Sequence, residues 1–358
     1  MRHLSYGFAG LVLAITVAGI LIWNRILTRL EEPLPARKSE WVLRFEQPLE
    51  PRALLSALRR AGWGERSVLL SLFVEHGLKP MELPAGEYAF SASDSFVDHL
   101  DRVRRHEVVL HTVSFSPGLD ARKTARVWAR AGLLDDPEAF LEAVRDPQLS
   151  RALDLGAEGL EGYLFPDVYA VPRGMSPEAL VRRMVSRFRQ AIRPLFGPDP
   201  EPDRLREAVW MAAQIQQSPV PSREWALLSA VLHARRESGW VLGSPSVPED
   251  REAPLSLYGP VRRRGPFEPG PIEVNPGLEA LRAVARPMDS EARHLVLQPD
   301  GSRIYCADRL CHREAVRGRR ERFRRLAVPT PPVMAPADSP TQAEDPSPAD
   351  RAAPESVP

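Results

Sequence analysis

Nine residues from Glu161 to Tyr169 read EGYLFPDVY and combine two carboxylates with several aromatic rings. Aromatic faces can pack against saccharide rings, and carboxylates can bind hydroxyl groups or move protons. In this interpretation Glu161 and Asp167 are candidate acids, and Tyr163, Phe165 and Tyr169 are candidate sugar-binding residues. A buried turn held by aromatic packing would have the same composition. The motif taken alone therefore favours neither a functional nor a purely structural role.

A second candidate is Gln216, near the end of the segment WMAAQIQQSPV. An apolar stripe made of Leu205, Val209 and Ala212 leads to it in steps of four, three and four residues. Such steps return to one face of a helix, so Gln216 is predicted to point inward and Gln214 away. A glutamine on an apolar face is either a buried residue bonded to a loop or part of a polar site.

The elements around these candidates predict an α+β fold rather than a regular βαβ series. WVLRFEQP and LPAGEYAF are predicted strands, and PRALLSALRRAG, VLLSLFVEHG and SFVDHLDRVRR are predicted helices. Next come a strand in EVVLHTVSF, a turn at 116–118 and a helix from Asp120. Helices and short strands broken by prolines continue to Leu326. We therefore expect a small N-terminal region followed by a larger mixed domain.

Three stretches of the chain resemble the endolytic murein transglycosylases, the YceG-like family of bacterial cell-wall enzymes. EGYLFPDVY is similar to the family hallmark, which typically reads EGYLFPDTY. The stretch from ELPAGEYAF to VSFSPGLDARKTARVWA resembles the small LysM-like module, a peptidoglycan-binding unit. PGPIEVNPG and the residues after it resemble the C-terminal stretch, so the resemblance covers roughly residues 40 to 326.

The resemblance implies an enzyme that cleaves glycan strands without water, leaving a 1,6-anhydro ring. In the family a glutamate protonates the glycosidic oxygen, from a helix that usually reads LASIVEKE. MAAQIQQS matches that helix without a gap, and SAVLHARR matches the following AAVFLNRL helix, which places the catalytic glutamate at Gln216. A glutamine can donate and accept hydrogen bonds but cannot give up a proton to a leaving group.

Two further acidic positions of the family are neutral here: Pro245 replaces an aspartate, and the turn at 115–118 lacks its acid. The main expectation is therefore a lytic transglycosylase relative that binds glycan and cleaves it little. One alternative is a non-catalytic scaffold for a cell-wall synthase. Another is an active enzyme with Glu161 or Asp167 as the relocated acid. Tyr258 and Asn275 complete the expected substrate-binding set.

The chain ends predict how the protein is attached and divided. The uncharged run from Leu4 to Asn24 has the roughly 20 residues that span a bilayer. A cleaved signal peptide is the rival interpretation of this run. With the resemblance, the run predicts a single-pass inner-membrane protein with a periplasmic main domain. The expected divisions are an anchor at 1–27, a linker at 28–40, an α+β region with the LysM-like module at 41–150, a transglycosylase-like domain at 151–327 and a disordered tail at 328–358.

Composition and cysteines set the remaining expectations. The net charge of +1 argues against a nucleic-acid partner, and no cofactor or metal site is expected. Cys306 and Cys311 are five residues apart, and a local disulfide is one of the states open to them in an oxidising compartment. A metal site with His312 would lack a fourth ligand.

Overall fold

The computed structural model describes residues 13–25, 28, 33, 38–63, 71, 74–75, 78, 81–155, 159–239, 256–258, 270–298 and 300–327. For 256–258 and 323–327 it describes the backbone alone. Helices and sheets alternate in a mixed arrangement, which confirms the predicted α+β class. The expected tail at 328–358, Pro245 and most of the expected helix VLLSLFVEHG lie outside these residues.

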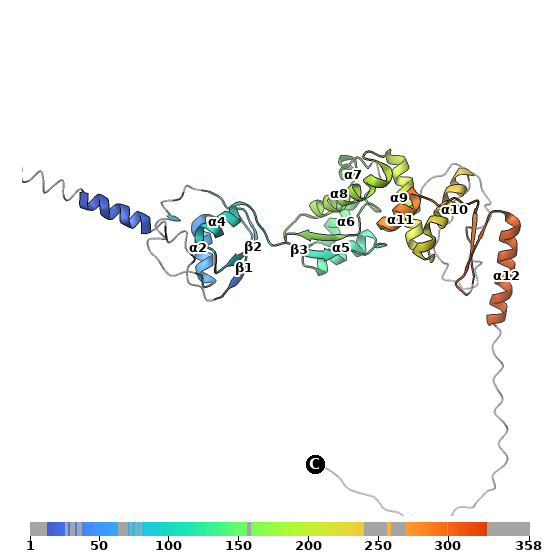
Figure 1. The fold of residues 1–358 in the computed structure, drawn as a ribbon, viewed down its shortest axis with the longest axis horizontal. Coiled ribbons are helices and arrows are strands. Elements are labelled where there is room, and N and C mark those ends of the chain that lie inside the picture. The colour runs from blue at the N-terminus through green and yellow to red at the C-terminus, as the bar shows by residue number, and fades with distance from the viewer. Residues whose placement is uncertain are drawn as a thin grey trace, which may run out of the picture.

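The N-terminal unit is a two-stranded antiparallel sheet with helices against it (Figure 1). Strand β1 (Glu40–Phe45) pairs with β2 (Gly86–Ser91), with Trp41 opposite Phe90. Helix α2 (Pro51–Arg60) begins at a proline, and α4 (Phe96–Arg104) begins with a capping box. These elements confirm the predicted strands and helices. Their buried side chains form a core of their own, from Trp41 to Val103.

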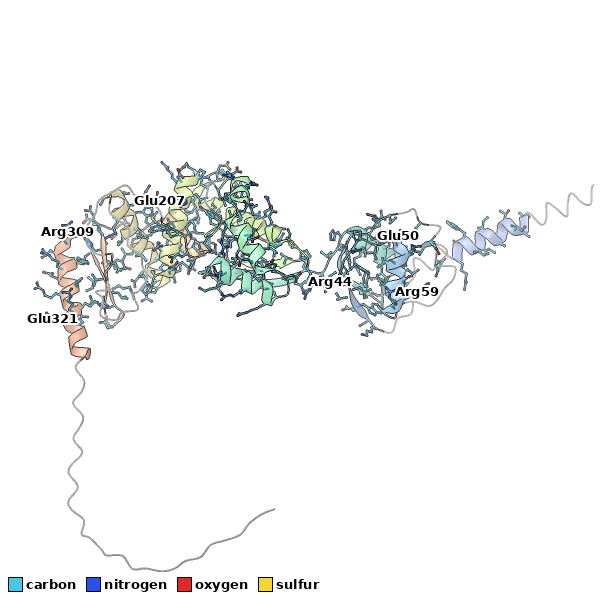
Figure 2. The ribbon with its side chains drawn as sticks, turned by 180° about the vertical axis from the view of Figure 1, so that it is seen from behind. Arg44, Glu50, Arg59, Glu207, Arg309 and Glu321 are labelled. Carbon is cyan, nitrogen blue, oxygen red and sulfur yellow. A yellow bond between two sulfur atoms is a disulfide. The ribbon has the colours of Figure 1, made fainter. Side chains whose placement is uncertain are left out.

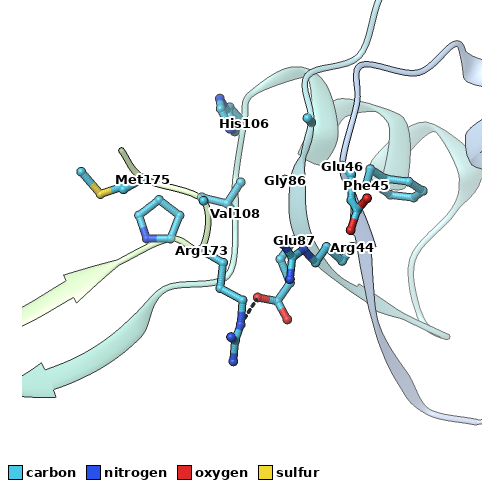
Figure 3. Close-up of a pocket in the computed structure, with 12 residues that line it drawn as sticks. Arg44, Phe45, Glu46, Gly86, Glu87, His106, Val108, Arg173 and Met175 are labelled. Atoms are coloured by element: carbon cyan, nitrogen blue, oxygen red, sulfur yellow. Dashed lines mark ion pairs between the residues drawn. The ribbon is translucent and has the colours of Figure 1, made fainter. Parts of the chain in front are cut away.

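Strand β3 (His111–Ser114) starts the larger unit by pairing antiparallel with β4 (Val168–Val171). One carboxylate links the two units. Glu87 Oε2 lies 2.6 Å from His111 Nε2. The same oxygen lies 3.3 Å from Arg173 Nε (Figure 3). Beside this pair is a cavity of about 420 Å³, lined by residues that include Arg44, Phe45 and Met175. The junction is therefore held by charged contacts between β2 and the first sheet of the larger unit.

The larger unit is mainly helical. Its elements are α5 (Ala121–Arg130), α6 (Pro137–Arg145), α7 (Pro147–Ala152), α8 (Pro177–Phe196), α9 (Pro202–Gln217), the 3₁₀ turn η2 (Ser222–Glu224), α10 (Trp225–Glu237) and α11 (Leu278–Ala285). One hydrophobic core runs from Val113 to Leu295. The expected domain boundary at 150 is therefore misplaced, because α5 and α6 pack into the same core as α8. The two cores divide between Val103 and Val113.

The C-terminal part is a three-stranded antiparallel sheet followed by a long helix. Strand β6 (His294–Leu297) lies between β5 (Ser256–Tyr258) and β7 (Arg303–Cys306), and α12 (Arg309–Ala327) follows. Cys306 and Cys311 form a disulfide with their Cα atoms 5.6 Å apart. The bond joins the end of β7 to the first turn of α12 and resolves the state of the two cysteines.

The expected membrane anchor falls partly outside the described residues, because residues 1–12 are not described. Residues 13–25 are helical, and Leu13, Ile15 and Leu21 are each more than 60% exposed. Of the helices that the structure describes, none combines the length and the apolar character needed to cross a membrane.

Candidate functional site

The hallmark turn EGYLFPD is held by the side chain of one distant residue. Asn275 Oδ1 accepts hydrogen bonds from the Gly162 N–H at 2.8 Å and the Leu164 N–H at 3.0 Å. Its Nδ2 donates to the Leu119 carbonyl at 2.8 Å and to Glu161 Oε1 at 2.9 Å. Asn275 is 2% exposed. Both the oxygen and the nitrogen of its amide are bonded to other groups of the protein. Asn275 therefore positions the hallmark turn and Glu161, rather than binding substrate as expected.

Glu161 lies between this asparagine and the start of α5. Both of its carboxylate oxygens accept from the Ala121 N–H at 3.0 Å, at the positive end of the helix dipole. The pKa of Glu161 is raised to about 7, mainly by burial; the hydrogen bonds from Ala121 and Asn275 oppose this rise, and the nearby Asp120 carboxylate adds to it. A carboxyl with this pKa is suited to proton transfer near neutral pH. Its oxygens, however, are turned toward the chain's own donors.

Gln216 is the next-to-last residue of α9 and lies next to the same region. It is half-buried, and its Oε1 accepts a hydrogen bond from the Gly277 N–H at 3.1 Å. Gly277 caps α11 and lies two residues after Asn275, which itself contacts the hallmark turn. Gln216 is thus linked to EGYLFPD through Gly277 and Asn275, although about 50 residues separate them in the sequence. That the two line one cleft stays a prediction. Its assignment to the family's acid position stays a prediction.

Close packing at three glycines brings these segments together. A Cβ on Gly162 would lie 2.6 Å from Ile272 Cγ2 and 2.9 Å from Val209 Cγ1 on α9. A Cβ on Gly277 would lie 2.9 Å from Pro117 Cγ, and one on Gly118 would lie 3.6 Å from Gln216 Cγ. The turn at 115–118, the hallmark turn and the end of α9 are thus neighbours because glycines leave room for them.

The amide of Gln216 retains hydrogen-bonding capacity. Within the described part of the chain, Oε1 is engaged by Gly277 and Nε2 has no protein acceptor. Among the described residues, neither N–H of this amide has an acceptor. An amide can bind a saccharide oxygen through these groups but cannot protonate a leaving group.

The predicted direction of Gln214 is wrong. Gln214 is 6% exposed and more buried than Gln216, and its Oε1 has no hydrogen-bond partner among the described residues. Residues 208–215 of α9 are all buried, because the helix is surrounded on several sides rather than packed on one face. The assumption that α9 has one apolar face therefore gave the wrong direction for Gln214.

Asp167 has a structural partner. Its Oδ2 lies 2.5 Å from Arg187 Nε on α8, and the Arg187 guanidinium lies 5.3 Å from the centre of the Phe165 ring. Its main-chain carbonyl accepts from the Phe115 N–H. These contacts tie β4 to α8 and leave Asp167 as a paired carboxylate rather than a proton donor. The relocated-acid alternative thus rests on Glu161.

The aromatic rings of the hallmark are buried. Tyr163 is 1% exposed, and Phe165 and Tyr169 are each 4% exposed. The Tyr163 ring packs edge-on against Phe188, and the Tyr169 hydroxyl donates to the Phe165 carbonyl at 2.6 Å. These three rings belong to the core in this structure, so they do not form the expected sugar platform. Tyr258 lies in β5, and its side chain is outside the described set.

Sequence reasoning missed two groups that build the site. The Ala121 N–H was not recognised as the donor for Glu161, and Gly277 was not recognised as the donor for Gln216. The glycine of the segment NPG was the available signal for Gly277, since a glycine often marks a close backbone approach. No pattern in the sequence near Ala121 indicates which carboxylate accepts the hydrogen bond from its N–H.

Comparisons with known proteins identify the family of the chain. Residues 47–247 match the YceG-like family, and the chain therefore belongs to that family. It is 22% identical over 295 residues to a protein named endolytic murein transglycosylase from Streptococcus pneumoniae serotype 2 (strain D39 / NCTC 7466). That match covers 71% of this chain and 53% of the relative, so the chain spans about half of its length.

A solved structure is also similar. It is the 2.6 Å crystal structure of a putative yceG-like protein from Listeria monocytogenes, with a TM-score of 0.43 and 15% sequence identity. The match covers 77% of this chain and 99% of the other.

Proposed function

We propose that this chain binds the glycan strands of peptidoglycan and that its lytic transglycosylase activity is lost or strongly reduced. Family membership and the named relative support the substrate class and an endolytic murein transglycosylase-like function. The observation that carries the proposal is the Gln216 amide beside Gly277, next to the hallmark turn. An amide there can hold a sugar oxygen and cannot protonate it. The LysM-like stretch at 82–129 is proposed as a second contact with peptidoglycan.

One observation favours a second candidate, an active enzyme with Glu161 as the relocated acid. The raised pKa of Glu161, about 7, is suited to a general acid and base. Against it, the Ala121 N–H and the Asn275 amide already occupy its oxygens. Reaching a glycosidic oxygen would require Glu161 to give up at least one of these bonds. We therefore place this candidate second.

Product analysis separates the two candidates. Purified wild-type protein and Gln216→Glu are incubated with uncrosslinked nascent glycan, and 1,6-anhydro products are resolved by mass. We expect the wild type to bind and release little product, and Gln216→Glu to gain activity toward the ~10²–10⁴ range of general acid–base catalysis. Gln217→Glu is the matched control, because it introduces the same carboxyl one residue further along the same helix.

Strong product release by the wild type would overturn the proposal that cleavage is lost. Loss of that release in Glu161→Gln, with binding kept, would then establish the second candidate. If neither wild type nor Gln216→Glu cleaves but both bind, the protein is a glycan-binding scaffold, and a cell-wall synthase becomes the proposed partner.

We further propose that the segment from Leu4 to Asn24 anchors the protein in the inner membrane with the main domain in the periplasm. The support is its uncharged length and the exposed apolar side chains of the helical residues 13–25. A reporter fused after Asp350 should be active only outside the cytoplasm. Activity in the cytoplasm would refute both the topology and access to peptidoglycan.

A further inference from the structure

Helix α12 carries a row of arginines that the proposed glycan site does not use. Arg309, Arg313, Arg317 and Arg320 follow steps of four, four and three residues. At about 100° per residue they fall within a sector of about 80° on one side of the helix. All four are exposed. The helix stands at the edge of the body, with Arg309 near one end and Glu321 near the other (Figure 2). We name these four residues the arginine row.

The opposite side of α12 fixes the direction in which the row faces. His312 is 5%, Ala315 8% and Arg319 4% exposed, so this side is packed. The Ala315 carbonyl accepts from Gln298 Nε2 at 3.3 Å, and Cys311 is bonded to Cys306 of β7. A helix attached in this way cannot rotate its arginines inward without breaking the disulfide or the packing.

The arginine row has no acidic partner within the part of the chain that the structure describes, where no carboxylate lies within 4.0 Å of these four guanidinium groups. Other arginines of the same unit are paired. Arg303 forms two hydrogen bonds to Glu224, at 2.6 and 2.7 Å, and Arg187 pairs with Asp167. In a chain whose net charge is only +1, four adjacent cations on one surface indicate an anionic partner.

The spacing of the row suits a partner with several carboxylates. Successive arginines rise by about 4.5 to 6 Å along the helix axis, and the whole row spans about 16 Å. A guanidinium binds a carboxylate through two parallel hydrogen bonds. A single exposed pair contributes little, but several pairs on one tethered partner act together. A flexible polymer with repeated carboxylates therefore fits this surface better than a single small anion.

We propose that the arginine row binds the carboxylates of the peptide stems on peptidoglycan glycan strands. This inference rests on the proposed function, because it adds a second contact to the same polymer. An anionic phospholipid surface is the competing partner. Helices that lie on membranes bury a broad apolar face, whereas Leu310 is the one large hydrophobic side chain exposed on the described part of α12. The composition of this surface favours the carboxylate polymer.

The test uses the full chain with all four arginines changed to glutamine. The control removes the same charge from exposed arginines on four separate helices of the larger unit, away from the LysM-like stretch: Arg145→Gln, Arg151→Gln, Arg182→Gln and Arg204→Gln. Binding is measured to purified glycan strands that carry stems, to strands with the stem carboxylates amidated, to strands with the stems removed enzymatically, and to vesicles of anionic phospholipid. Thermal melting checks that each variant is folded.

We expect the row variant to bind stem-bearing strands on the order of tenfold more weakly than the wild type, while the control variant binds normally. Amidation or removal of the stems should weaken wild-type binding to the level of the row variant. The difference between wild type and row variant should then disappear. Equal binding of wild type and row variant to stem-bearing strands would overturn the inference. So would a loss seen only with vesicles of anionic phospholipid.

The proposed function is judged separately, by wild-type binding to strands without stems. If that binding is absent but stem-dependent binding persists, the glycan site fails while the arginine row stands.

Discussion

Replacing Asn275 by alanine should destabilise the larger unit more than almost any other single change at the site. The side chain accepts from the Gly162 and Leu164 N–H groups and donates to the Leu119 carbonyl and to Glu161. Alanine removes all four bonds and leaves these groups without their partner. The site is buried, since Asn275 itself is 2% exposed.

The magnitude follows from the number of groups left unsatisfied. A buried donor or acceptor that loses its partner costs about 1–3 kcal/mol, and water entering the space recovers part of the loss. Since the four bonds share one side chain, their costs do not simply add. We therefore expect the free energy of unfolding to fall by about 3–5 kcal/mol.

Asn275→Asp separates the two halves of the network. It keeps the acceptor for Gly162 and Leu164 but replaces the donating amide by an oxygen that faces Glu161 and the Leu119 carbonyl. The repulsion between two carboxylates is relieved when one is protonated. This variant should therefore be destabilised at pH 8 and recover toward the wild type at pH 5.

Urea unfolding followed by circular dichroism measures both variants, with Gln190→Ala as the control. Gln190 is exposed on α8, and its change should stay within about 0.5 kcal/mol. A loss below about 1 kcal/mol for Asn275→Ala would refute the role of Asn275 in holding the hallmark turn. So would Asn275→Asp with wild-type stability at pH 8.

Three further predictions address neighbouring residues. Because the folded-state pKa of Glu161 is raised from 4.5 to about 7, the folded chain holds this proton more tightly than the unfolded chain. Stability should fall by about 3 kcal/mol as pH rises from 4.5 to 7, and Glu161→Gln should remove this slope from a pH series of urea titrations. Gly162→Ala should cost about 2–4 kcal/mol, since its φ is +91° and a Cβ would clash with Val209. Gly174→Ala is the control, because Gly174 has a φ of +80° but open space around it, so this variant should show only the backbone cost. Equal losses of thermal stability in the Gly162→Ala and Gly174→Ala variants would contradict the packing argument. Gln214→Leu should raise the free energy of unfolding by about 1 kcal/mol, because it removes a buried oxygen without a partner; a clear loss would show that this oxygen has a partner in solution.

The sequence by itself determined the local elements and the family. Helix starts at Pro51, Ser95 and Asp120 were predictable because prolines and side-chain caps act within one turn of the chain. The strands β1 and β2 were predictable from composition and from the turn residues around them. The hallmark turn was recognisable because its residues are contiguous, and the match to residues 47–247 confirmed the family.

Only the tertiary structure decided which of these residues are available for chemistry. The aromatic rings of the hallmark suit a sugar platform by type, but packing buries them: two of them lie against Phe188 of α8, and Tyr169 lies against Phe115 and Trp128. Asp167 and Glu161 are equivalent candidates in sequence, yet one meets Arg187 and the other meets the start of α5. These outcomes depend on contacts between segments 20 to 114 residues apart, as do the Asn275 bonds to the turn. Local propensity acts over a few residues, so it cannot specify which distant side chain will satisfy a buried polar group.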